Sequence, residues 1–95
     1  MNSNRITEAE VNGLQVSKLF ESETTETLFI TLEKGKIFPK HTSPKETLLV
    51  VIQGSINFHI DNKIIALKQH EIYSFLPAIE HYVIAKENSK FLIIR

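Results

Sequence analysis

The stretch LLVVIQGSINFHIDNKIIAL, residues 48–67, holds the pattern that decides the fold. It begins with a continuous aliphatic run rich in β-branched residues, which is typical of a strand covered on both faces. After a glycine, apolar residues alternate with polar ones from Ile56 to Ile60, as in a strand with one buried face. Asp61 and Asn62 follow, and both tolerate a positive φ. This stretch therefore predicts two strands, a two-residue hairpin turn and a returning strand.

The same period of two extends outward in both directions. Apolar runs or alternating segments occur at Leu14–Phe20, Leu28–Leu32, Leu48–Ile52, Ile56–Ile60, Ile64–Leu67, Ile72–Leu76, His81–Ala85 and Phe91–Ile94. Eight or nine short strands at this spacing indicate an all-β sandwich or barrel. Only Thr7–Glu10 suggests a helical turn. Because an open sheet would expose unpaired strand edges, we expect closure into a barrel or edge pairing between subunits.

Composition narrows the class of protein. The 95 residues suffice for a single domain, 1–95, and 42% of them are hydrophobic. Eleven basic and eleven acidic residues give no net charge, so the sequence predicts neither a nucleic-acid nor a membrane partner. The absence of cysteine excludes disulfides and thiolate metal sites. No signal peptide is recognisable, so we expect a cytoplasmic location. We expect Met1–Glu10 to be a loose arm, or one that packs on a partner.

The segment from Gly35 to Gly54 resembles the first sequence motif of the cupins, the RmlC-like jelly-roll superfamily. That motif places a His-x-His pair and a glutamate between two glycines, and His41 lies at the position of the first histidine. The segment Glu71–His81 resembles the second motif, which runs to a proline and then a histidine. The resemblance covers about residues 28–94. It implies an all-β, double-stranded β-helix, that is, a jelly-roll barrel.

In cupins, two histidines and a glutamate of the first motif and one histidine of the second typically hold a divalent metal. Carried over by position, the resemblance places His41 and His81 at two of these four ligand positions. Ser43 and Thr47 occupy the other two. Because neutral hydroxyls are poor ligands for transition metals, we expect an incomplete metal site and no cofactor. Glu46 comes one residue early, which points it to the opposite face of a strand.

Two interpretations of the histidine pair remain open. In the first, His41 and His81 are polar residues of a ligand pocket, bonded to each other, to water or to the two hydroxyls. In the second, they hold a divalent transition metal whose shell is completed by Glu46 or His59. We favour the first interpretation.

Other side chains have simpler explanations. His59 alternates with the apolar residues of its strand and should face outward, and His70 should lie in a loop. Lys40 and Lys45 flank His41 and could attract an anionic ligand, although loop lysines are usually only solvated. The aromatic residues are expected to fill the core rather than line a pocket. They are Phe38, Phe58, Tyr73 and Phe75.

Three functions are compatible with this pattern. The leading hypothesis is a homodimeric protein that binds a small molecule in its barrel through His41, Ser43, Thr47 and His81. The alternative is a metal-dependent enzyme of the dioxygenase, isomerase or decarboxylase type that uses His41 and His81. A third possibility is a structural or regulatory partner without pocket chemistry, favoured if apolar side chains fill the barrel. The fold does not choose among them, because cupins host many chemistries.

Overall fold

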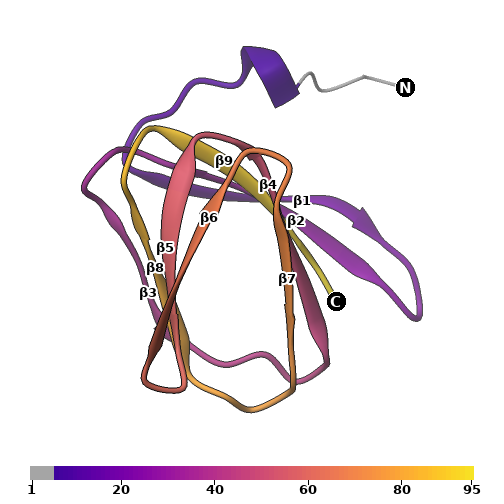
Figure 1. Ribbon diagram of the computed structural model, residues 1–95. Helices are drawn as coiled ribbons and strands as arrows, with labels where there is room; N and C mark the ends of the chain where they lie inside the picture. Colours follow the sequence, from indigo (N-terminus) through magenta and orange to yellow (C-terminus); the bar gives the residue numbers. More distant parts are fainter. Residues whose placement is uncertain (1–5) are drawn as a thin grey trace.

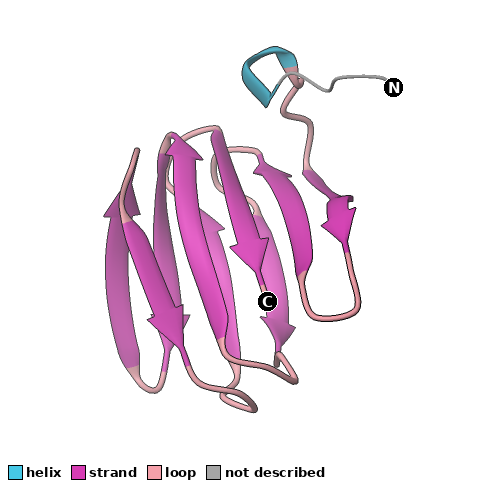
Figure 2. Ribbon diagram, turned by 90° about the vertical axis from the view of Figure 1, so that its right-hand side faces the viewer, coloured by secondary structure: helices cyan, strands magenta, loops and turns pink. Residues whose placement is uncertain are grey.

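The computed structural model describes residues 6–95, which form an almost entirely β structure (Figures 1 and 2). The strands are β1 (Leu14–Glu21), β2 (Glu26–Leu32), β3 (Ile37–His41), β4 (Thr47–Gln53), β5 (Ser55–Ile60), β6 (Lys63–Lys68), β7 (Ile72–Phe75), β8 (His81–Ala85) and β9 (Ser89–Ile94). The all-β prediction is confirmed. Alternation alone did not identify β3, because Pro39 and Lys40 interrupt its pattern. No helix in residues 6–95 is long and apolar enough to cross a membrane.

The strands form two antiparallel sheets that face each other, as Figure 2 shows from the side. The five-stranded sheet has the order β1-β2-β9-β4-β7, and the four-stranded sheet has the order β3-β8-β5-β6. Strands far apart in the chain are therefore neighbours, and β9 lies between β2 and β4. This arrangement is the jelly roll that the sequence predicts.

The core lies between the two sheets. It consists of the side chains that point inward, which alternate along each strand with side chains that point outward. Its buried members are Ile30, Leu32, Leu49, Val51, Ile56, Phe58, Ile60, Leu67, Phe75, Val83, Ala85, Phe91 and Ile93. Burying each large member contributes roughly 1.5–3 kcal/mol of hydrophobic stabilisation. In β4, Leu49 and Val51 are inaccessible, whereas Leu48 and Val50 are half-buried. The sequence predicts that β4 is covered on both faces. Residues 6–95 bury only its inner face completely, and its outer face is half-buried.

Two turns show how local sequence fixes the strand register. Asp61 and Asn62 have φ values of 51° and 60°, so the predicted hairpin turn is present between β5 and β6. Gly54 separates β4 from β5 at a φ of 88°. A Cβ atom there would lie 2.5 Å from the Asn88 carbonyl oxygen and 2.5 Å from Ser89 Oγ. Only glycine fits this close approach between two chain segments.

The β1–β2 hairpin projects beyond the paired sheets (Figures 1 and 2). Every residue of β1 is exposed, because β1 is an edge strand with no second sheet opposite it. Before β1, the chain forms a single 3-10 turn, η1 (Ile6–Glu8), close to the predicted turn. The Lys90 amine, buried on β9, donates to the carbonyl oxygens of Ile6 at 2.7 Å and Thr7 at 3.1 Å. Positions 1–5 of the arm predicted at Met1–Glu10 lie outside the described residues.

Candidate functional site

The two motif histidines meet across a pair of strands. His41 ends β3, His81 begins β8, and the two are direct partners in the antiparallel register. The register shifts between Phe38 and His41, which brings the two imidazoles together. His81 is only 1% exposed, whereas His41 is half-buried. The structure therefore joins two residues that lie 40 positions apart in the sequence.

The hydrogen bonds of the pair determine where its protons lie. The Nε2 atoms of His41 and His81 are 2.9 Å apart. His81 Nδ1 lies 2.9 Å from the Ile79 carbonyl oxygen, and His41 Nδ1 lies 2.6 Å from that of Pro39. Because a carbonyl only accepts, each Nδ1 carries its hydrogen, and neutral rings would oppose two lone pairs at Nε2. The contact is a hydrogen bond when the pair holds one additional proton between the two Nε2 atoms.

The electrostatic environment disfavours a proton on the buried His81 ring. Burial lowers the pKa of His81, and the nearby His41 and Arg95 lower it further, while the bond to the Ile79 carbonyl opposes the shift. Burial therefore favours the neutral form of the His81 ring.

Aromatic rings surround the pair on its inner side. The Phe75 ring centroid is 4.6 Å from that of His81, and the Phe58 centroid is 5.5 Å away. Phe38 approaches His41 at 4.4 Å. These contacts exclude water from one side of the pair and agree with the prediction that the aromatic residues fill the core.

Ser43 and Thr47 make hydrogen bonds with other partners. The buried Ser43 Oγ accepts from Arg95 Nη1 at 3.2 Å, and Arg95 Nε donates to Glu26 Oε1 at 2.9 Å. Thr47 Oγ1 donates to the Lys45 carbonyl oxygen at 2.9 Å. Both hydroxyls thus stabilise the chain that leads into β4. Arg95 is not among the residues that the sequence predicts for the site, because only the pairing of β2 with β9 brings it to this position.

The donor set does not fit a tightly held metal. Each Nδ1 bond to a carbonyl is of the kind that orients histidine ligands. However, residues 6–95 contain no cluster of three or more histidine, cysteine or acidic side chains able to hold a metal. Glu46 is exposed, and His59 lies on the outer face of β5, as predicted, stacked on Tyr82 with ring centroids 4.3 Å apart. Neither side chain completes a shell around His41 and His81.

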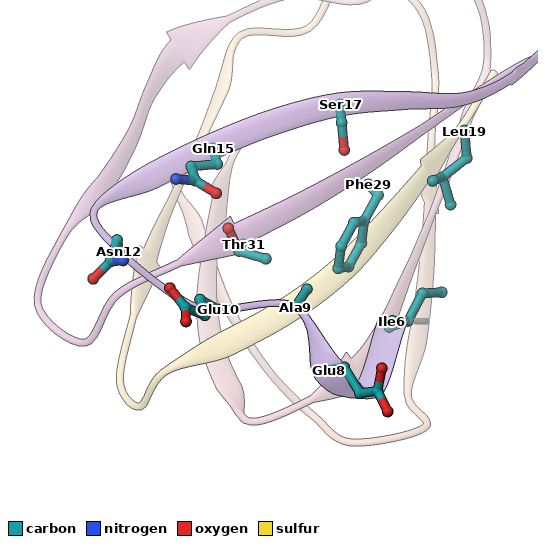
Figure 3. Close-up of a pocket in the computed structure, with 10 residues that line it drawn as sticks. All are labelled: Ile6, Glu8, Ala9, Glu10, Asn12, Gln15, Ser17, Leu19, Phe29 and Thr31. Carbon is teal, nitrogen blue, oxygen red and sulfur yellow. The ribbon is translucent and has the colours of Figure 1, made fainter. Parts of the chain in front are cut away.

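Three hollows in the described surface include neither histidine in their lining, although one is lined by Lys40, Glu80 and Tyr82, the chain neighbours of the pair. One of about 520 Å³ lies between the arm and the outer side of β1 and β2, and Gln15, Thr31 and Glu10 are among the residues that line it (Figure 3). Within residues 6–95, Thr31 Oγ1 is buried without a hydrogen-bond partner. The other two, of about 650 and 240 Å³, lie beside the β5–β6 turn and beside the β1–β2 hairpin.

These hollows bear on three earlier expectations. None of them is lined by His41, Ser43, Thr47 or His81, so a pocket at those four residues stays a prediction. Lys40 lines the 650 Å³ hollow, and Lys45 Nζ donates to the Thr24 carbonyl oxygen at 3.3 Å. His70 lies in an exposed turn, as predicted.

Comparisons with known proteins agree with this architecture. A cupin-like protein from Desulfovibrio desulfuricans, described as RmlC-like, superposes with a TM-score of 0.87 at 23% identity, covering 99% of this chain and 94% of that one. An RmlC-like cupin with a double-stranded β-helix fold, from Methanocaldococcus jannaschii, gives 0.80 at 22% identity, covering 93% and 84%. A conserved Streptococcus pyogenes protein of unknown function gives 0.84 at 18% identity, covering 98% and 84%. At these identities the likeness concerns the fold alone.

Sequence comparison extends the result from the fold to the family. No curated protein matches the chain. The family model of the Cupin domain matches residues 28–94, which include both strands that carry the histidine pair. The chain therefore belongs to the cupin family.

Proposed function

We propose that this chain is a metal-independent binding protein for a small molecule, which it recognises through the imidazole pair. The observation that carries the proposal is the 2.9 Å contact between the Nε2 atoms of His41 and His81. Two rings fixed by their Nδ1 bonds present convergent Nε2 atoms at the buried end of the barrel. Such a convergence of polar groups in an apolar wall is typical of small-molecule sites.

The charge of the site favours a ligand with a carboxylate. The Arg95 guanidinium lies near His81, and a proton shared between the two Nε2 atoms would make the pair cationic. A carboxylate that contacts both Nε2 atoms would accept a hydrogen bond from each of them only if each Nε2 carries a hydrogen, so binding would take up protons from solvent onto the pair, and the carboxylate would stabilise the charged rings. Glu26 already neutralises much of the Arg95 charge, at 2.9 Å. The imidazole pair, rather than the guanidinium, is therefore the principal recognition element.

Access to the pair is from the side of His41. The apolar core fills the centre of the barrel, which favours the structural or regulatory alternative, and it confines the proposed binding site to the end where β3 and β8 pair. His81 is enclosed by phenylalanine rings, whereas half-buried His41 lies on an edge strand with an irregular register. A ligand would enter by replacing the hydrogen bond between the two rings.

The proposal is tested by nuclear magnetic resonance of the imidazole nitrogens. The full chain is titrated with a panel of small carboxylic acids and, as controls, the corresponding primary amides. We expect at least one acid to shift the Nε2 signals of both His41 and His81 with a saturable curve, and the His41→Gln variant to lose the effect. The His59→Gln variant, changed on the outer face, should keep it. Equal binding to wild type and His41→Gln would contradict the proposal.

The alternative is a metal-dependent enzyme that uses His41 and His81. The Nδ1 bonds to the Pro39 and Ile79 carbonyls favour it, because such bonds commonly orient histidine ligands. Calorimetric titration of chelator-treated protein with Mn²⁺, Fe²⁺, Ni²⁺ and Zn²⁺ separates the two functions. Stoichiometric binding that disappears in both histidine variants would bring the enzyme forward. Weak binding, unchanged in the variants, is expected from the proposed function.

A further inference from the structure

We propose that the loop between β7 and β8, residues 76–80, is a gate over the imidazole pair and that one backbone hydrogen bond closes it. The inference rests on the proposed function, because it concerns access to the same site. The bond runs from the Ala78 amide to the Ser43 carbonyl oxygen at 2.9 Å. It joins the β7–β8 loop to the loop between β3 and β4, residues 42–46, at one end of the barrel (Figure 1).

Each of the two joined loops adjoins one histidine of the pair. His41 is the last residue of β3 and lies two positions before Ser43. His81 is the first residue of β8 and lies three positions after Ala78. Between them, the Ile79 carbonyl oxygen holds His81 Nδ1 at 2.9 Å. A ligand that separates the two rings passes between these loops, so the bond that joins the loops controls entry.

The β3–β4 side of the gate is firmly held. Ser43 is 2% exposed, and its Oγ accepts a hydrogen bond from Arg95 Nη1 at 3.2 Å. Arg95 Nε donates to Glu26 Oε1 at 2.9 Å, and the backbones of these two residues exchange two further hydrogen bonds. The Ser43 carbonyl oxygen is therefore a fixed acceptor, and the part that moves is the β7–β8 loop.

The β7–β8 side of the gate is strained at Ala78. Its φ of 66° lies in the left-handed region, where the Cβ atom crowds the backbone. Among the described residues, the others with a side chain and a positive φ are Asp61, Asn62 and His70. These three are of the types enriched in that region, whereas alanine is not. The closed loop therefore holds strain that opening releases, which makes the bond easier to break.

Few other contacts hold the loop closed. Leu76 is 60% exposed, Glu80 is exposed, and only Ile79 packs against the core. Within residues 6–95, the bond from Ala78 is the only backbone hydrogen bond between this loop and another segment. Segments with few buried apolar contacts open locally at low free energy, while the rest of the fold stays intact. The β7–β8 loop thus has the properties of a gate that opens without unfolding.

The test compares Ala78→Gly with a matched control, His70→Gly. His70 also has a positive φ, of 71°, but it lies in the turn after β6, at the opposite end of the barrel (Figure 1). Two rates are measured on the full chain. The first is hydrogen exchange of the backbone amide at position 78, by nuclear magnetic resonance and corrected for its intrinsic rate. The second is modification of the His81 imidazole by diethyl pyrocarbonate, followed by mass spectrometry above the usual histidine pKa.

We expect Ala78→Gly to slow both rates by roughly fivefold, because glycine adopts the closed conformation without a crowded Cβ atom. The two factors should agree, since the same opening limits both reactions. Ser43→Ala removes the hydroxyl that Arg95 holds, so it should accelerate both rates. His70→Gly should change neither rate. Modification of His59, on the outer face of β5, should be the same in every protein and serves as the reference.

The comparison of variants decides the outcome, and urea unfolding verifies that all three fold. If His81 reacts as fast in Ala78→Gly as in wild type, or if His70→Gly slows it equally, the loop is not a gate. Unchanged rates in Ser43→Ala would also overturn the proposal. Neither measurement uses a carboxylic acid, so failure of the gate would leave the proposed function standing. Failure of acids to bind would in turn leave the measured opening in place.

Discussion

Burial of the His81 imidazole makes the stability of this fold depend on pH in a defined window. In the folded chain the pKa of His81 lies below the usual value, chiefly because burial disfavours the charged ring. In the unfolded chain the same ring binds a proton near pH 6.5. Between these two pKa values the unfolded state holds more protons than the native state. The free energy of unfolding therefore rises with pH there, and stability is lost as the pH falls below about 6.5.

The magnitude follows from a single titrating group. One proton taken up on unfolding gives a slope of at most about 1.4 kcal/mol per pH unit. For a small domain with a total stability of about 5–10 kcal/mol, that slope is readily measured. Glu26 does not change the stability in this pH range. The hydrogen bond from Arg95 lowers the pKa of Glu26 below about 4.5, so its contribution to the free energy of unfolding is lost only at more acidic pH.

The assay is urea unfolding at a series of pH values from about 8 to about 5, compared among three proteins. Wild type should lose stability below about pH 6.5. His81→Gln should be less stable at neutral pH, because the hydrogen bond to His41 is altered, but should have a shallower slope. His59→Gln, changed on the outer face, should keep the wild-type slope. An equal slope in wild type and His81→Gln would refute the assignment of this dependence to the buried ring.

Three further changes test other parts of the structure. Gly54→Ala should lower the free energy of unfolding by at least about 2 kcal/mol, because a Cβ there meets backbone and a side chain at 2.5 Å, whereas Gly35→Ala, with open space around it, should lose only about 1 kcal/mol. Chemical denaturation measures both, and equal losses would contradict the steric argument. Ser89→Ala should lose about 1–3 kcal/mol, since its buried Oγ bonds the β4–β5 turn; a neutral effect would argue against that role. Ser43→His combined with Thr47→Glu restores the family's ligand types and should tighten Ni²⁺ binding at least about tenfold by calorimetry; unchanged affinity would show that more than these two positions prevents metal binding.

The sequence predicts the fold well because its signals are local. Alternation and aliphatic runs mark most strands, and Asp61-Asn62 marks a turn through backbone preference alone. β3 was missed as a strand since it is short and contains Pro39, and its strand character comes from pairing with β8. The order of strands is not a local property. The family resemblance implied a jelly roll, and the order of the strands in each sheet was not predicted.

The candidate site is only partly predictable for the same reason. Motif positions identified His41 and His81, and their bond to each other was among the partners expected. The roles of the two hydroxyls depend on what the folded chain places beside them. Arg95 reaches Ser43 from the other end of the sequence, so no spacing rule connects them. Nor does sequence reveal that the Nδ1 atoms are committed to carbonyls, which sets the tautomer of each neutral ring.

The position of β9 between β2 and β4 has a consequence for how the chain folds. During synthesis β2 and β4 emerge early, yet the strand that joins them in one sheet emerges after all the others. Until Ser89–Ile94 has left the ribosome, the two halves of the five-stranded sheet have no ladder between them. Folding must therefore await the late segment and close long loops at once, which places this small domain among slow, all-β folders on the millisecond-to-second scale. In that interval the apolar strands remain exposed to aggregation and to chaperones.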